Sequence, residues 1–107
     1  MDASLYTVET FAPHLNTAFR VEVAPGSFLP FELIQVERGP EHPRVMMFWL
    51  MFRGPADPVY PQRIYHIQHA ALGEMDLFLV AVGNAGNGVQ YQAVFNRMIQ
   101  DAPASHP

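Results

Sequence analysis

A chain of 107 residues with a net charge of −4 has room for one domain with a single core. Its six basic residues are all arginine and are scattered singly along the chain. Proteins that bind phosphates usually carry a basic stripe, so we expect no nucleic-acid partner. Cysteine is absent, which excludes disulfides, thiolate catalysis and cysteine-ligated metals.

The low content of charged residues predicts association. Hydrophobic residues make up 50% of the chain and charged residues 15%, against about 25% charged in an average globular domain. Because a small domain of this kind exposes apolar surface when alone, we expect a homo-oligomer or a protein partner. Residues 1–4 lack the basic and then apolar pattern of an export signal, so the expected location is cytoplasmic, with no membrane partner.

The first element expected in the chain is a short helix over residues 5–15. Val8, Phe11 and Leu15 recur there at helical spacing, and such an apolar face can cover one end of a sheet. Pro13 fits only within the first turn of a helix. The helix therefore either ends just before Pro13 or restarts there.

Two strands are expected next, at residues 17–23 and 29–37. The first alternates apolar and charged side chains, which is typical of a half-buried strand. Pro25-Gly26 predicts the turn between them. The second strand has apolar side chains on both faces, with Ile34 and Val36 as the expected inward pair on one face and Phe31 and Leu33 on the other. This division predicts a bulge or a change of partner sheet within the strand.

Residues 45–52 form the longest apolar run, bounded on both sides by turn-rich segments. The length suits a strand, because a membrane-spanning helix needs about 20 apolar residues. Alternation predicts that one set of side chains lies in the core, namely Met46, Phe48, Leu50 and Phe52. The opposite face must be covered by the helix or by a second subunit, and we predict it as an interface: Val45, Met47, Trp49 and Met51.

The second half of the chain predicts three more strands, at residues 62–69, 75–82 and 89–97, after a proline-rich loop. Glycine and asparagine at residues 83–88 predict a hairpin loop. The expected fold is mainly β, a six-stranded antiparallel small barrel or compact sandwich with one short N-terminal helix. We expect one domain over residues 1–97 and a flexible tail over residues 98–107.

Residues that could carry chemistry are few. His66 and His69, three apart on a strand, point to opposite faces and cannot hold one metal ion, so either is expected to hydrogen-bond a carbonyl of the following loop. Glu74 and Asp76 share a strand face, either as an acid–base pair or as a solvated edge. No serine or glycine pattern matches a nucleophile elbow or a phosphate loop. We therefore expect no catalytic residue, no metal and no cofactor.

Two functions are compatible with these patterns. The leading hypothesis is a non-enzymatic structural or protein-interaction β-domain that self-assembles or belongs to a larger complex. The alternative is a small-molecule binder or minor enzyme with its site at the mouth of the barrel. The candidate ligand-binding residues are then Arg53, Tyr60, Tyr65, His66 and His69. Alternatively, Arg53 could form an ion pair with Asp57 or Glu74.

Five short motifs are spread along the chain, TFAPHL at 10–15, FRGP at 52–55, HxxLG at 69–73, LFLV at 77–80 with Gly83, and YQAVFNR at 91–97. As a set they resemble a family of small bacterial single-domain proteins of unknown function, over residues 5–97. The chain differs from the family at Ala81, where proline is frequent, and at Gln92, where an acidic residue is common. The resemblance implies a single domain and adds no catalytic residue.

Overall fold

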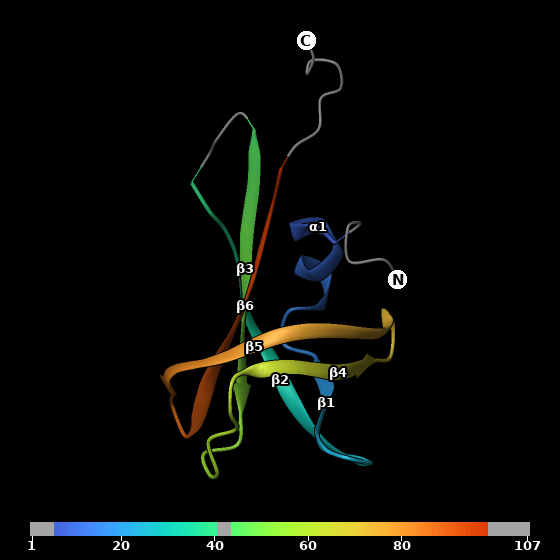
Figure 1. Ribbon diagram of the computed structural model, residues 1–107, viewed down its shortest axis with the longest axis vertical. Helices are drawn as coiled ribbons and strands as arrows, with labels where there is room; N and C mark the ends of the chain where they lie inside the picture. Colours follow the sequence, from blue (N-terminus) through green and yellow to red (C-terminus); the bar gives the residue numbers. More distant parts are fainter. Residues whose placement is uncertain (1–5, 41–43, 99–107) are drawn as a thin grey trace.

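The computed structural model describes residues 6–40 and 44–98, without the side chains of residues 97 and 98. Within these residues the chain forms six strands and one short helix (Figure 1). The elements are α1 (Val8–Phe11), the 3-10 turn η2 (Ala12–His14), β1 (Ala18–Ala24), β2 (Ser27–Arg38), β3 (Val45–Gly54), β4 (Arg63–His69), β5 (Gly73–Ala85) and β6 (Gly88–Met98). The predicted flexible tail lies outside the described residues, apart from residue 98.

The strands pair antiparallel in the order β1-β2-β3-β6-β5-β4, and the sheet closes on itself as a ring. Closure between β1 and β4 involves only two residue pairs, Arg20 with Gln68 and Val21 with Ile67. The predicted mainly β class, with six antiparallel strands and one short N-terminal helix, is confirmed. The sheet is ring-like but is not a true barrel. Among the described residues no helix is long and apolar enough to cross a membrane.

The helix restarts at its proline, as one of the two alternatives predicted. Helix α1 ends at Phe11, and Pro13 lies in the first turn of η2, where its missing N–H costs no hydrogen bond. Phe11 is fully buried and lies near Phe19, Phe48 and Phe95, with ring centroids 5.7 to 6.4 Å apart. Helix α1 therefore covers the inner face of β3 and β6, beside their upper halves in Figure 1.

The interior of the ring is filled by side chains that alternate along each strand. On β3 the buried residues are Phe48, Leu50 and Phe52, three of the four predicted, while Met46 near the strand end is half-buried. The largest fully buried side chains come from α1 and from all six strands: Tyr65, Tyr91, Phe11, Phe19, Phe31, Phe48, Phe52, Leu33, Leu50, Ile67, Leu79 and Val21. This core fixes which face of every strand points outward.

The predicted irregularity of β2 is a bulge, because the β2–β3 register shifts between Leu33 and Gln35. Phe31 and Leu33 are buried before the bulge, and Val36 packs against the core after it. The expected inward pairing of Ile34 with Val36 is therefore wrong, since the extra residue changes which parity faces the core. Ile34 is half-buried at the shift.

The hairpin between β5 and β6 is tighter than predicted. Strand β5 continues to Ala85, and only Gly86 and Asn87 remain in the turn. Gly86 has φ +64°, which a two-residue hairpin turn requires at its first central position and which glycine adopts without steric cost. Asn87 is thereby held near the end of β3, where Gly88 approaches Arg53 and Gly54.

Candidate functional site

The outer face of the sheet carries apolar side chains on four strands. Trp49 on β3 is paired with Val94 on β6, and Phe78 on β5 is paired with Ile64 on β4. Val94 and Phe78 each lie two residues beyond the last β5–β6 pairs, which include Val80 with Gln92, so all four point outward. We call these outward-facing apolar side chains and their neighbours the outer apolar band: Trp49, Met51, Ile64, Phe78, Val80 and Val94.

Several members of the outer apolar band are open to solvent. Ile64 is 65% exposed, Phe78 51% and Val94 50%, while Trp49, Met51 and Val80 are half-buried. Single exposed apolar residues are ordinary, but adjacent ones, such as the cross-strand pairs Phe78–Ile64 and Trp49–Val94, are characteristic of an interaction surface. The band is therefore the strongest candidate for a functional surface in the part of the chain that is described.

Helix α1 does not cover this face. It packs on Phe48, which the alternation of β3 places on the face opposite Trp49, and Glu9 of α1 is 2.6 Å from Arg38 on that same inner side. The predicted interface residues Val45, Met47, Trp49 and Met51 consequently stay half-buried on the outer face. Which molecule covers them remains a prediction.

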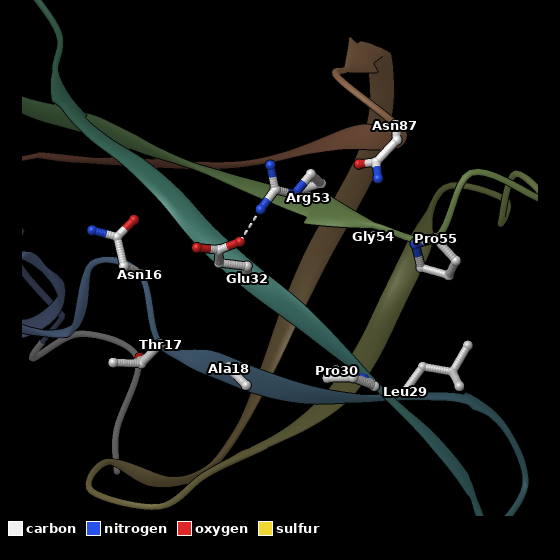
Figure 2. Close-up of a pocket in the computed structure, with 10 residues that line it drawn as sticks. All are labelled: Asn16, Thr17, Ala18, Leu29, Pro30, Glu32, Arg53, Gly54, Pro55 and Asn87. Atoms are coloured by element: carbon white, nitrogen blue, oxygen red, sulfur yellow. Dashed lines mark hydrogen bonds and ion pairs between the residues drawn. The ribbon is translucent and has the colours of Figure 1, made fainter.

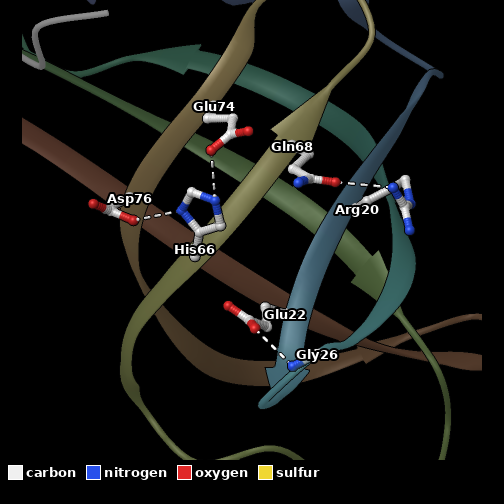
Figure 3. Close-up of polar contacts among 7 residues, drawn as sticks. All are labelled: Arg20, Glu22, Gly26, His66, Gln68, Glu74 and Asp76. Carbon is white, nitrogen blue, oxygen red and sulfur yellow. Dashed lines mark hydrogen bonds and ion pairs between the residues drawn. The ribbon is translucent and has the colours of Figure 1, made fainter.

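Carboxylates lie at both ends of the outer apolar band. At the β2 end Glu37 is paired with Trp49 across the strands, and its Oε1 accepts a 2.8 Å hydrogen bond from Gln35 Nε2. At the β4–β5 end are Asp76 and Glu74 (Figure 3), which the alternation of β5 places on the same outer face as Phe78. Carboxylates therefore lie near Trp49 and near Phe78, and Arg63 lines the same pocket as Asp76.

His66 lies between the two carboxylates of β5. Its Nδ1 is 3.0 Å from Asp76 Oδ1, and its Nε2 is 3.0 Å from Glu74 Oε1 (Figure 3). The hydrogen bond with Asp76 is the main cause that raises the pKa of His66, and the charge of Glu74 acts in the same direction. Both ring nitrogens can donate only when the ring is protonated, so the geometry favours the imidazolium form.

The chain matches the family model described as Domain of unknown function (DUF6916) over residues 6–95. It belongs to this family. Searches of curated proteins and of solved structures returned no match. The DUF6916 match begins at Tyr6, beneath α1, and ends at Phe95, against which Tyr6 packs with ring centroids 5.8 Å apart. The matched residues therefore include α1, strands β1 to β5 and most of β6.

Arg53 pairs with Glu32 of β2, not with Asp57 or Glu74 (Figure 2). The two residues are direct partners in the β2–β3 register, which long-range strand pairing sets. They line an open pocket of about 570 Å³, together with Asn16, Asn87 and Pro55 among others. Of the five predicted ligand-binding residues, Arg53 alone belongs to the lining of this pocket.

Tyr60 and Tyr65 hold the loop between β3 and β4. Tyr65 is buried, and its hydroxyl donates to the carbonyl of Pro61. The amide of Tyr60 donates to Tyr91 Oη at 2.9 Å, and burial raises the pKa of Tyr91. Both predicted ligand residues thus serve, in this arrangement, to fasten a loop to the core.

His69 is an internal strut. Its Nδ1 accepts hydrogen bonds from the amides of Ala71 and Leu72, both at 3.1 Å, so the proton must lie on Nε2. Nε2 then donates to Thr17 Oγ1 at 2.9 Å. The predicted hydrogen bond from a histidine to a carbonyl of this loop is therefore wrong, because His69 Nδ1 is the acceptor and the loop supplies the amide donors. Burial, and after it the proximity of His14, lowers the pKa of His69.

The five predicted ligand-binding residues therefore occupy separate places. His66 lies on the outer face, His69 lies inside between β4 and β1, and Arg53 lies beside β2. Sequence reasoning did not single out Ile64, Phe78 and Val94. A signal was present, since residues 77–82 are apolar on both faces, as residues 45–52 are.

Proposed function

We propose that this domain binds protein surfaces through the outer apolar band, by self-assembly or within a larger complex, and performs no catalysis of its own. The observation that carries the proposal is the position of α1 on the inner face, so that α1 does not cover the band. A cytoplasmic location belongs to the same proposal, and imaging of a fluorescent fusion in the host cell tests it.

Covering the band yields useful binding free energy. A phenylalanine side chain carries about 200 Å² of surface, so covering the exposed half of Phe78 removes about 100 Å² from water. At about 25 cal/mol per Å² that corresponds to about 2.5 kcal/mol. An aromatic anchor beside an aliphatic side chain, as Phe78 has in its cross-strand partner Ile64, is typical of the centre of an interface.

Hydrodynamic size in the host's own extract tests the proposal. The wild-type chain is expected to migrate as part of a larger species there or to self-associate when purified. Phe78→Glu should reduce that species to the monomer, because the new carboxylate would be buried in the contact. Val59→Glu is the matched control, since Val59 is 61% exposed in the β3–β4 loop and lies outside the band. A monomer under every condition, or equal behaviour of both variants, contradicts the proposal.

The pocket beside Arg53 favours a second candidate, the binding of a small molecule. Its open volume, an arginine already held by Glu32 and two carboxamides suit a small polar ligand with an apolar part. A fragment screen by thermal shift tests this function. A ligand that raises the melting temperature of the wild type and not of Arg53→Met supports it, and no stabilising fragment argues against it.

A further inference from the structure

We propose that the pocket beside Arg53 binds a free α-amino acid with an apolar side chain, whose carboxylate contacts Arg53 and whose ammonium group contacts Glu32. The inference rests on the small-molecule function proposed for this pocket, because it names the chemical class of the ligand. Its support is the charge, the unused hydrogen-bonding groups and the apolar walls of the pocket.

The pocket is a hollow on the outer face of β1, β2 and β3 (Figure 2). Cross-strand pairing places Ala18 beside Glu32 and Glu32 beside Arg53, so these three residues form one row. Pro30 lies two residues before Glu32 and shares its face of β2, and Pro55 follows the end of β3. Alanine and proline have short side chains, which leaves open space beside the longer side chains of the ion pair.

Two opposite charges lie side by side in this hollow. Arg53 and Glu32 form an ion pair, and they are the only charged residues among the described residues that line the pocket. Their side chains are 40% and 34% exposed, so a ligand can reach both. A lone anion attracted by Arg53 is repelled by Glu32, and a lone cation meets the reverse. A zwitterion satisfies both residues, because each of its charges can lie nearest to the opposite charge of the pair.

Both members of the ion pair keep unused hydrogen-bonding groups. Glu32 Oε1 accepts from Arg53 Nη2, which is the one hydrogen bond that either side chain forms among the described residues. The remaining guanidinium N–H groups can donate to a carboxylate, and Glu32 Oε2 can accept from an ammonium group. Such charge-assisted hydrogen bonds are about twice as strong as neutral ones. This difference favours a zwitterion over a neutral polar ligand such as a sugar.

The backbone around the ion pair is held in place. A Cβ atom on Gly88 would lie 2.8 Å from Arg53 Cγ, so the backbone of the β5–β6 hairpin packs directly on the stem of Arg53. Before β1, the amide of Asn16 donates to the carbonyl of Leu33 at 2.7 Å. A site whose backbone is already ordered costs a ligand less binding free energy.

The uncharged lining suits the rest of an amino acid. Asn16 and Asn87 have carboxamides that form no hydrogen bond with another described residue, so they can add contacts to the ammonium group or the carboxylate. The volume of about 570 Å³ is within the range of small-molecule sites. Apolar surface for an aliphatic side chain comes from four lining residues: Ala18, Leu29, Pro30 and Pro55.

Four related probes test the inference by NMR titration of the isotope-labelled protein in mildly acidic buffer. L-leucine carries both charges, N-acetyl-L-leucine only the carboxylate, L-leucinamide only the ammonium group, and N-acetyl-L-leucinamide neither. Signals of the Arg53 Nε–H and of the Asn16 and Asn87 carboxamides report binding at the pocket itself. L-leucine is expected to bind most tightly, and removal of either charge should weaken binding about 5- to 10-fold.

Variants of the ion pair should change which probe is preferred. Glu32→Gln should weaken binding of L-leucine and strengthen binding of N-acetyl-L-leucine, because the carboxylate of that probe then meets Arg53 without an opposing charge. Arg53→Met should have the corresponding effect in favour of L-leucinamide. Glu9→Gln is the matched control, since it removes a carboxylate from the Arg38 ion pair outside the pocket, and it should leave all four affinities unchanged. The probe series on the wild type is decisive even where a variant fails to fold.

Several outcomes overturn the inference: equal binding of L-leucine and N-acetyl-L-leucinamide, preference of the wild type for a singly charged probe, an unchanged order of probes in both folded variants, or no binding by any probe. Under these outcomes, a fragment that stabilises the wild type and not Arg53→Met leaves the small-molecule function standing. If no fragment of any class stabilises the wild type, the small-molecule function fails as well.

Discussion

Removing the imidazole of His69 is expected to destabilise the fold by about 3 kcal/mol. The His69→Ala change deletes three hydrogen bonds, two from the amides of Ala71 and Leu72 and one to Thr17. Each contributes about 1 kcal/mol net, and the amides are left without their acceptor. The ring also packs on Phe19 with centroids 4.2 Å apart, so the loss of packing acts in the same direction.

Urea unfolding at neutral pH measures this effect. For a domain of this size the slope is about 1.5 kcal/mol per M, so a loss of about 3 kcal/mol lowers the midpoint by about 2 M. His14→Ala is the control. The His14 ring lies 4.8 Å from that of His69, but its contact with Thr17 is through the backbone carbonyl, and we expect a loss below about 1 kcal/mol. Equal midpoints for wild type and His69→Ala would refute the role of His69 as a strut.

The pH dependence of the same pair of proteins gives a second check. Because the pKa of His69 is lowered in the folded state, its contribution to the free energy of unfolding is present above the unfolded-state pKa of about 6.5 and is lost as pH falls below that pKa. The difference in stability between wild type and His69→Ala should therefore narrow on acidification. A difference that widens toward pH 5 would contradict the neutral tautomer.

Three further predictions concern the pH behaviour of the outer face and the packing of the core. His66 has a raised pKa in the folded protein, so its contribution to stability is complete below about pH 6.5 and is lost as pH rises through the folded pKa. The melting temperature of His66→Asn should therefore differ from that of the wild type in mildly acidic buffer and converge with it at alkaline pH. Phe11→Ala should cost about 3 to 5 kcal/mol by urea unfolding, because Phe11 is fully buried between α1 and the strands, and a loss below 1 kcal/mol would mean that the helix does not seal the ring. Gly54→Ala should cost about 1 to 3 kcal/mol in the same assay, since its Cβ would lie 2.9 Å from ring atoms of Phe31 and Tyr91, and unchanged stability would show that both rings move freely.

Local patterns predicted much of the fold. The alternation of residues 45–52 identified which of its side chains enter the core, because the period of a strand is fixed by its backbone. The contact of His66 with Asp76 was also readable in principle. The turn at residues 70–72 is short, so the register of its hairpin follows from the turn itself.

Contacts between distant segments were not readable in the same way. Arg53 meets Glu32 through a register that includes the bulge of β2, and nothing local to either residue fixes that register. The face of β3 on which α1 packs was not predictable either, because both faces of β3 are apolar and either could have contacted Phe11. Tertiary packing decided both, and with them which residues remain outside.

The short pairing of β1 with β4 makes one side of the ring a seam. Two residue pairs join these strands, whereas β3 and β6 share ten. Local opening is expected to begin there, because few backbone hydrogen bonds have to break, and amide exchange at Arg20 and Val21 should report it. An opened seam presents two unpaired strand edges, each able to add a strand from another chain. The seam is thus the place where this domain is most exposed to strand exchange between copies.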